Sequence, residues 1–248
     1  MAIGKNKVIA FIPVRGGSKG IKNKNIVDLD GCPLLMWSVY AAAASKYIDR
    51  IVVSSDSKDI LFTANCHSRH FHIHVDCMDR PSNLAEDLST TESVIDYFIK
   101  NDSNVRDNDI IVLMQATSPF RHDDLIDKLI EGVNRERISS CLTVNERSPF
   151  FWNSWGDSKV ARPLYDPKNR KRRQDMSCSD IKIQENGNLY GFTVSGYKIS
   201  GHRSPFRSTV VMSDLVHSIE IDNQLDLEVC RAISKMEIIQ EWKNRIVI

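Results

Sequence analysis

Glycines and cations gather in one short stretch near the N-terminus, where they could bind phosphate groups. The stretch contains Arg15, Gly16, Gly17, Ser18, Lys19, Gly20 and Lys24. Glycines let the backbone turn sharply and approach a ligand closely, so that N–H groups can point at phosphate oxygens. The P-loop and dinucleotide-binding patterns do not fit, because Lys19 precedes Gly20 and because Gly16 and Gly17 are adjacent. We interpret the stretch as a nucleotide triphosphate site, with a solvated glycine turn as the alternative.

Two carboxylates near the C-terminus could bind a divalent cation. The segment Ile219–Asp222 is predicted to end a strand, and the two-residue strand period would place Glu220 and Asp222 on one face. Mg²⁺ prefers hard oxygen ligands and shares them with substrate phosphates. The alternative is a solvated edge strand.

Two further clusters have less specific interpretations. Four histidines, His67, His70, His72 and His74, are close in sequence, and a predicted strand at His72–Val75 would place two of them on one face. No Cys or carboxylate completes a coordination set at standard spacing, so exposed histidines are favoured over a metal site.

The basic run Lys168–Arg173 could be a solvated face, an anion contact through Arg173 or a nucleic-acid patch. It contains no aromatic residue for base stacking, which disfavours nucleic acid.

The elements that must position these residues alternate along the chain. Predicted strands are Val8–Ile12, Arg50–Ser55, His72–Val75, Ile110–Met114 and Ser140–Val144. Predicted helices are about 33–44, Lys58–Cys66, Thr90–Ile99 with Ser89 as a cap, Asp123–Val133, and one from Gln224. This alternation predicts a parallel sheet covered on both faces, with ligands at the carboxyl ends of its strands. Because the glycine stretch and Gln115–Arg121 both follow such ends, we expect them to face one cleft.

Composition and charge exclude several classes of protein. The chain has 248 residues, which suits one α/β domain, and a net charge of +1 gives no reason to expect a nucleic-acid or membrane partner. No apolar run is long enough to span a bilayer, and the N-terminus lacks a signal-peptide core. The six cysteines are scattered without a C-x-x-C pair, as in a reduced cytoplasmic protein.

Six blocks of residues, in order along nearly the whole chain, resemble the motifs of the acylneuraminate cytidylyltransferases. They are Arg15–Gly20 with Lys24 and Asn25, Arg80 with Pro81, Gln115–Arg121, Arg172–Gln174, Asn186–Gly187 with Tyr190, and Ile219–Asp222 with Leu225 and Asp226. The resemblance implies a Rossmann-like, three-layer α/β nucleotidyltransferase fold with a mostly parallel sheet. It implies a single domain over residues 1–248, with a small dimerisation insertion at about 147–184.

The same resemblance implies an activity. A CTP-dependent enzyme of this family transfers CMP to the anomeric hydroxyl of a nonulosonic (sialic-type) acid and releases pyrophosphate, for synthesis of a cell-surface glycan such as lipopolysaccharide or capsule. It implies Mg²⁺ (or Mn²⁺) as the cofactor, and a homodimer in which an arm from the insertion helps to complete the partner's active site.

Residue by residue, the motifs imply three groups of site residues. The catalytic residues are Arg15, Lys24 and Asp222, and the nucleotide is bound by Arg15, Gly16, Ser18, Lys19, Lys24, Asn25, Arg80, Ser89 and Thr91. Asn25 would contact the ribose, and Arg80, Ser89 and Thr91 would surround the cytosine. The acceptor is bound by Gln115, Thr117, Ser118 and Arg173, and the metal by Asp222 and Glu220. Glu220 stands where the family usually has Asp.

Departures from the motifs affect the acceptor more than the reaction. Ala116 replaces a proline, Lys22–Asn23 replaces a proline-containing pair, and Gly187–Leu189 replaces a more usual Gly-Ala-Ile. The acceptor could be N-acetylneuraminic, legionaminic, pseudaminic or a related acid. The alternative functions are a nucleotidyltransferase acting on Kdo or a sugar-1-phosphate, and a non-catalytic nucleotide-binding protein of the same fold.

Overall fold

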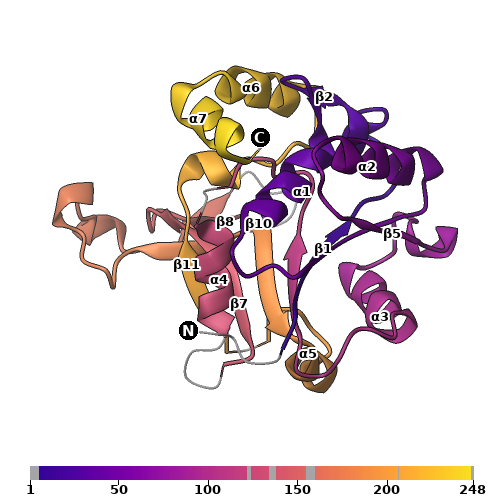
Figure 1. Ribbon diagram of the computed structural model, residues 1–248. Coiled ribbons are helices and arrows are strands. Elements are labelled where there is room, and N and C mark those ends of the chain that lie inside the picture. The colour runs from indigo at the N-terminus through magenta and orange to yellow at the C-terminus, as the bar shows by residue number, and fades with distance from the viewer. Residues whose placement is uncertain (1–5, 122–123, 134–137, 155–159, 206, 247–248) are drawn as a thin grey trace.

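A seven-stranded sheet forms the centre of the molecule (Figure 1). The computed structural model describes residues 6–121, 124–133, 138–154, 160–205 and 207–246. In spatial order the strands are β11 (Thr209–Met212), β7 (Ser140–Arg147), β10 (Lys182–Thr193), β6 (Ile110–Met114), β1 (Val8–Pro13), β4 (Arg50–Ser55) and β5 (Asp76–Asp79). Strand β10 is antiparallel to both neighbours, and the other pairs are parallel. The mostly parallel sheet confirms the predicted fold class.

Helices cover both faces of this sheet, and each face has its own apolar core. One core includes residues from α1 (Leu34–Ala44), α2 (Lys58–His70), α4 (Leu125–Val133), α6 (Gln224–Ser234) and α7 (Glu237–Ile246). The opposite core includes residues from α3 (Thr91–Asn101) and α5 (Val194–Ser200). Strands β1 and β6 are buried on both faces, which explains why they are continuous apolar runs rather than alternating ones. In the described part of the chain, no helix has the length and apolar character needed to cross a membrane.

The register of the two central strands decides where the ligand-binding loops begin. Strand β1 pairs in parallel with β6, and Phe11 lies opposite Leu113. Both strands therefore end at the same edge of the sheet, within a residue or two of each other. The loop that follows β1 and the turn that follows β6 start side by side, as the sequence predicts.

Several element boundaries differ from the predictions. The strand expected at His72–Val75 is absent, because His72 has a left-handed backbone with φ of 56°, which a strand does not accommodate. The strand is instead β5, directly after it. Helix α2 continues past Cys66, where it was predicted to end, and the predicted start of α4 at Asp123 lies outside the described residues.

The cap of α3 is also different from the prediction. Thr90, rather than Ser89, is the N-cap, and its Oγ1 accepts a hydrogen bond of 3.1 Å from the backbone N–H of Ser93. The Ser89 hydroxyl donates to the carbonyl of Asn83 at 2.8 Å. Ser89 therefore stabilises the preceding turn, and the observed cap is the residue directly after the predicted one.

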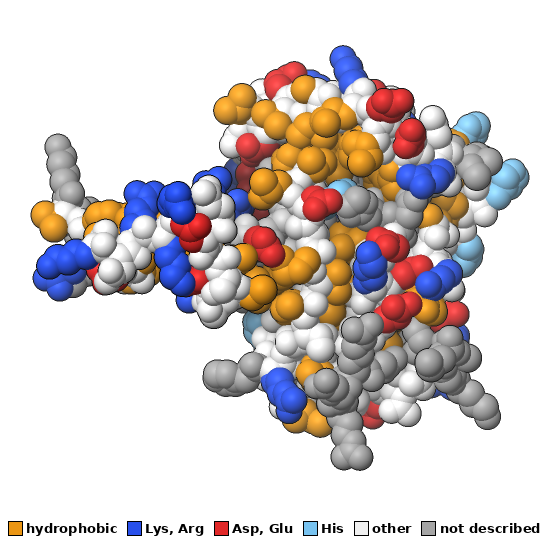
Figure 2. All heavy atoms as spheres, turned by 90° about the vertical axis from the view of Figure 1, so that its left-hand side faces the viewer, with side chains coloured by type: hydrophobic (Ala, Val, Ile, Leu, Met, Phe, Trp, Pro, Cys, Tyr) orange, Lys and Arg blue, Asp and Glu red, His pale blue; other side chains and the backbone are white. Residues whose placement is uncertain are grey.

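An arm between β7 and β10 projects sideways from the sheet (Figure 1). It lies within the predicted insertion and contains β8 (Trp152–Ser154), β9 (Ala161–Pro163), and the 3₁₀ turns η3 (Pro167–Asn169) and η4 (Arg173–Asp175). Figure 2 shows Lys and Arg side chains gathered on this arm. Two of them pair locally, Lys171 with Asp180 at 2.8 Å and Arg172 with Asp175 at 2.6 Å.

Candidate functional site

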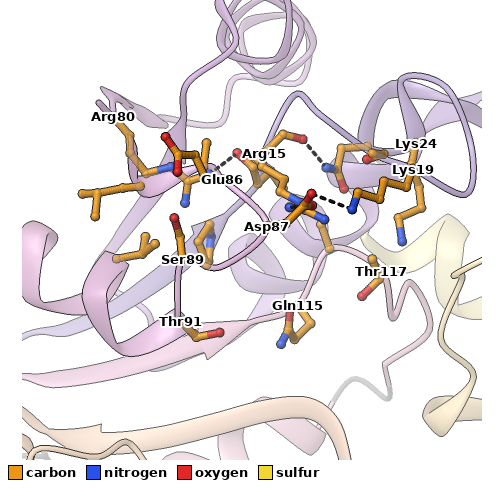
Figure 3. A pocket seen from close by; sticks show the side chains of 18 of the residues that line it. Arg15, Lys19, Lys24, Arg80, Glu86, Asp87, Ser89, Thr91, Gln115 and Thr117 are labelled. Atoms are coloured by element: carbon orange, nitrogen blue, oxygen red, sulfur yellow. Dashed lines mark hydrogen bonds and ion pairs between the residues drawn. The ribbon is translucent and has the colours of Figure 1, made fainter. Parts of the chain in front are cut away.

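A pocket of about 500 Å³, the main pocket, opens where β1 and β6 end (Figure 3). Most of the predicted site residues line it: Arg15, Ser18, Lys19, Lys24, Asn25, Arg80, Ser89, Thr91, Gln115, Thr117 and Asp222. The predicted residues that do not line it are Gly16, Ser118, Arg173 and Glu220. The two loops expected to face one cleft therefore do so, joined by residues from α3 and from the C-terminal segment.

The glycine loop approaches other segments closely at two of its glycines. A Cβ added to Gly16 would lie 2.9 Å from the Cβ of Ser57, and a Cβ added to Gly20 would lie 2.0 Å from the carbonyl oxygen of Asp222. The Gly16 N–H donates to Asp56 Oδ1 at 3.0 Å. Gly16 therefore anchors the loop to the end of β4, and its N–H is already engaged by protein rather than directed at a ligand.

Two cations of the glycine loop share one carboxylate in the pocket. Arg15 Nη1 donates to Asp87 Oδ1 at 2.9 Å, and Lys19 Nζ lies 2.6 Å from Asp87 Oδ2 (Figure 3). Hydrogen bonds from Lys19 and Arg15 lower the pKa of the Asp87 carboxyl, so that it is ionised at neutral pH. Asp87 lies in an irregular polar segment with no motif or period, so no sequence signal predicted its place in the site.

The third cation is held by the C-terminal segment. Lys24 Nζ donates to the carbonyl of Ile221 at 2.7 Å and lies 3.2 Å from Asp222 Oδ1. Its side chain is 13% exposed, whereas that of Asp222 is 69% exposed. Lys24 is thus fixed at the pocket wall, while the Asp222 carboxylate remains accessible to a ligand or a metal.

Arg80 lines the main pocket with a side chain that is almost fully buried. Its side chain is 4% exposed, and its Nη2 donates to the carbonyl of Val14 at 3.1 Å and lies 3.7 Å from Asp56 Oδ1. Burial lowers the pKa of this guanidinium. Asp56 was not predicted as a site residue, although a carboxylate directly after a predicted strand was a usable signal.

The turn after β6 depends on a buried guanidinium. Arg121 is fully buried, its Nη2 donates to the carbonyl of Gln115 at 2.6 Å, and its Nη1 donates to Ser38 Oγ at 2.9 Å. Burial lowers the pKa of Arg121 to about 9. Ser118, which was predicted to face the acceptor, is also fully buried within this turn and does not line the main pocket.

A second pocket, of about 390 Å³, lies next to the turn after β6. It is lined by Asn145, Arg147, Gln184, Glu185, Asn186, Gly187, Tyr190, Ser218 and Glu220. Thr117 of the main pocket donates from Oγ1 to Glu220 Oε1 at 3.0 Å, so the two pockets share a polar border. The hydroxyl of Tyr190 donates to Glu185 in this second pocket.

The predicted strand at Ile219–Asp222 is wrong. The segment has no strand pairing, and its recorded backbone bond to the sheet region is from the Ile221 N–H to the carbonyl of Thr117 at 2.9 Å. Glu220 lines the second pocket and Asp222 lines the main one, so the two carboxylates do not form one face. A period-two argument fails here because there is no pleated strand to apply it to.

Two further predicted groups lie away from the main pocket. Arg173 lies exposed on the projecting arm, outside both pockets of this chain. Within the described residues, no group of three or more His, Cys, Asp or Glu side chains comes together as a metal site. Because there is no strand at His72–Val75, His72 and His74 do not share a strand face.

Comparison with known proteins shows which proteins this chain is similar to. The profile of the family described as "Cytidylyltransferase" matches residues 9–152, which is more than half of the chain. N-acylneuraminate cytidylyltransferase of Oncorhynchus mykiss is 35% identical over 76% of this chain and 42% of its own length. The protein of that name from Escherichia coli is 27% identical over 98% of this chain and 57% of its own length. The chain therefore spans about half the length of these two relatives.

Other similar proteins match the chain from end to end. CMP-N,N'-diacetyllegionaminic acid synthase of Legionella pneumophila is 28% identical over 95% of this chain and 98% of its own length. A CMP:2-keto-3-deoxy-manno-octonic acid synthetase solved with CTP has a TM-score of 0.65, at 14% identity, over 95% of this chain and 100% of that chain. A 4-diphosphocytidyl-2C-methyl-D-erythritol synthase from Anaerococcus prevotii has a TM-score of 0.66, at 14% identity, over 94% of this chain and 98% of its own chain. At this identity the structures show a shared fold.

Proposed function

Because this chain belongs to the cytidylyltransferase family, and its sequence relatives include N-acylneuraminate cytidylyltransferases and a CMP-N,N'-diacetyllegionaminic acid synthase, we propose that it transfers CMP from CTP to a nonulosonic acid. The anomeric hydroxyl of the acid would attack the α-phosphorus of CTP, and pyrophosphate would leave. The observation that carries the proposal is the gathering of Arg15, Lys19 and Lys24 with Asp222 in one pocket. Positioning and charge stabilisation are the main requirements of such a phosphoryl-type transfer.

The main pocket is proposed to hold CTP. Arg15, Lys19 and Lys24 would bind the triphosphate, since charge-assisted hydrogen bonds contribute about 1.5–3 kcal/mol each. The base would lie toward Arg80, with Ser89 and Thr91 nearby. The buried position of Arg80 supports this orientation, because a rigid wall suits a planar base better than a flexible phosphate tail.

The ribose is proposed to lie against Asn25. The Asn25 amide nitrogen donates to the carbonyl of Arg15 at 2.9 Å. This bond fixes the side chain and leaves its Oδ1 as the atom suited to accept from a ribose hydroxyl.

The donor set at Asp222 fits a divalent cation such as Mg²⁺ (or Mn²⁺). Its carboxylate is exposed, faces the phosphate-binding cations and is a hard oxygen ligand. When bound, such a metal would supply positive charge to the phosphates and lower the pKa of the attacking hydroxyl. Glu220, also predicted as a ligand, lies beyond Thr117 in the second pocket, so we assign the metal first to Asp222.

The second pocket is proposed to hold the acceptor. Its lining of amides, hydroxyls, Arg147, Glu185 and Glu220 suits a ligand with many hydroxyl groups and one carboxylate. It borders the main pocket through Thr117, and Gln115 lies on that side of the main pocket. An acceptor bound there would therefore be adjacent to the triphosphate.

The arm supports a proposed homodimer. Arg173 is exposed and reaches neither pocket of its own chain, so an acceptor contact by this residue requires a second copy. Sedimentation should show a dimer, and mixing Arg173→Ala with Lys24→Ala should restore part of the activity that each variant lacks. Absence of both results would remove the dimer from the proposal.

The function is tested by pyrophosphate release from CTP with Mg²⁺ across a panel of nonulosonic acids, with Kdo, sugar-1-phosphates and UTP as controls. Release with one nonulosonic acid, and not with UTP, would establish the reaction and identify the acceptor. Release only with Kdo or a sugar-1-phosphate would assign a different nucleotidyltransferase. CTP binding without turnover on any acceptor would favour the non-catalytic alternative.

A further inference from the structure

The carboxylate of Asp87 lies between two of the cations of the main pocket (Figure 3). Its two oxygens bind different partners, Oδ1 with Arg15 Nη1 at 2.9 Å and Oδ2 with Lys19 Nζ at 2.6 Å. A phosphate group would present oxygens to the same donors in the same way. In the ligand-free protein, Asp87 therefore satisfies the donors that a polyphosphate would need.

The Asp87 side chain is held in place weakly, although the turn that carries it has hydrogen bonds of its own, from the Ala85 N–H to the carbonyl of Ser82 at 2.9 Å and from the Ser89 N–H to the carbonyl of Glu86 at 3.1 Å. The recorded side-chain partners of Asp87 are Arg15 and Lys19, and its side chain is 48% exposed. Leu88 beside it is 94% exposed and adds no apolar anchor. Exposed ion pairs contribute only about 0–1 kcal/mol, so releasing Asp87 from the two cations costs little.

The other two cations of the main pocket, Lys24 and Arg80, do not interact with Asp87, and each is bound to a backbone carbonyl. Lys24 donates to a backbone carbonyl as well as pairing with Asp222, and Arg80 is fixed by the carbonyl of Val14. Displacing Asp87 would therefore free Arg15 and Lys19 without disturbing the pocket wall.

We propose that Asp87 is an internal competitor for polyphosphate: its carboxylate occupies Arg15 and Lys19 in the free protein and is displaced when the triphosphate binds. The identity of the natural ligand rests on the proposed function. A ligand with several phosphate charges competes well with a single carboxylate, whereas a ligand without them does not. The same competition would favour release of pyrophosphate after transfer.

The test is calorimetric binding of inorganic tripolyphosphate, inorganic pyrophosphate and cytidine, in EDTA at low ionic strength. The variant is Asp87→Asn, which removes the charge and keeps the volume. Glu86→Gln is the matched control in the same segment, because Glu86 lines the pocket but forms no ion pair with any of the described residues. Asp107→Asn is the remote control, because that exposed carboxylate pairs with Lys198 at 2.6 Å outside the pocket.

We expect Asp87→Asn to bind tripolyphosphate and pyrophosphate at least threefold more tightly than the wild type. Glu86→Gln should change these affinities less, Asp107→Asn should not change them, and the cytidine affinity should be the same in all four proteins. Unchanged or weaker tripolyphosphate binding by a folded Asp87→Asn variant would overturn the proposal, and so would an equal gain in Glu86→Gln. No tripolyphosphate binding by either wild type or Asp87→Asn would overturn it too.

This experiment is independent of turnover. If no acceptor supports pyrophosphate release and Asp87→Asn still tightens tripolyphosphate binding, the proposed function fails and the competition by Asp87 stands. If turnover is found and the affinities do not change, the competition fails alone.

Discussion

At the scale of single residues, charges in the main pocket are arranged in two groups. Arg15 and Lys19 share the exposed Asp87, while Lys24 is held against the exposed Asp222 by a backbone carbonyl. Of the three cations, only Lys24 is nearly buried, with 13% of its side chain exposed, whereas Lys19 is 75% exposed. Both carboxylates are accessible as well. In the chemistry that we propose, Asp222 binds the metal and Asp87 competes with polyphosphate for Arg15 and Lys19.

Replacing Asp222 by Asn should lower kcat with Mg²⁺ by at least about a hundredfold, because the change removes the metal-binding charge and keeps the side-chain volume. Metal-free CTP binding and the melting temperature should be nearly unchanged, since Asp222 is exposed. Steady-state kinetics with titrated Mg²⁺ measure the effect. Glu220→Gln is the control, because Glu220 faces the second pocket, and its Mg²⁺ dependence should stay close to that of the wild type. Near-normal rates for Asp222→Asn would refute the assignment of the metal to this residue.

At the scale of elements, the glycine loop and the start of α6 are built against each other. The contact is between Gly20 and the carbonyl of Asp222, with no room for a side chain, whereas Gly17 has no atom within 4 Å of an added Cβ. The Gly20 contact fixes how far the phosphate-binding loop lies from the proposed metal ligand.

Replacing Gly20 by Ala should therefore move the Asp222 backbone, lower the melting temperature by several degrees and weaken CTP binding. A Cβ 2.0 Å from a carbonyl oxygen cannot be accommodated without a backbone shift. Gly17→Ala is the matched control, and its melting temperature should equal that of the wild type within error. Thermal melts and calorimetric titration with CTP measure both quantities. A Gly20→Ala protein with wild-type stability and affinity would show that the loop is not fixed by this contact.

The cap of α6 also positions Asp222. Asp226 Oδ2 accepts from the N–H groups of Asp222 and Asn223 at 2.9 and 3.0 Å, and Asn223 Oδ1 accepts from the Asp226 N–H at 3.1 Å. This capping box satisfies backbone donors at the helix start and holds the preceding residue in place.

Asp226→Ala should cost about 0.5–2 kcal/mol of unfolding free energy and should also reduce activity. The control is Thr193→Ala, which removes the cap of α5 on the opposite core, where Thr193 Oγ1 accepts from the Gly196 N–H at 3.1 Å. It should lose a similar stability without a change in kcat. Urea denaturation and pyrophosphate release measure the two effects. Equal activity in both variants would mean that the cap does not position Asp222.

At the scale of the whole molecule, one of the two apolar cores, the one that includes α1 and α6, excludes water from three of the six cysteines. Cys32, Cys141 and Cys230 are buried, and Cys66, Cys77 and Cys178 are exposed. Burial raises the pKa of the Cys32 and Cys230 thiols to about 12, so that almost no reactive thiolate forms near neutral pH.

Iodoacetamide at pH 8 should therefore modify only the three exposed cysteines of the native protein, with Cys77 slower because burial also raises its pKa. All six should react in guanidinium chloride, because unfolding removes the burial that suppresses ionisation. Mass spectrometry of the labelled protein counts the modified sites. Rapid native labelling of Cys32 or Cys230 would contradict the packing of the core around α1 and α6.

Much of the fold follows from the sequence alone. Apolar runs such as Val8–Ile12 and Ile110–Met114 have few alternatives to buried parallel strands, and the glycine and cation pattern identified the loop that follows the first of them. Where the local sequence pattern was ambiguous, the predicted ends of helices and strands were wrong. The positive φ of His72 accompanies a turn in which its N–H donates to the carbonyl of Arg69 at 3.1 Å, and Thr90 takes the cap position next to Ser89. Residue types alone do not distinguish these neighbouring positions.

The candidate site likewise has features that the sequence predicts and features that only the structure shows. Residue types and motif order determined the cations, Asp222 and the pocket they would form, because strand ends at one sheet edge follow from parallel pairing. Only the tertiary structure decided that Asp87 holds two of those cations, that Ser118 is buried and that Glu220 faces a different pocket from Asp222. These are contacts between segments far apart in the chain. They depend on side-chain direction and on distances of a few ångströms, which periodicity and spacing do not encode.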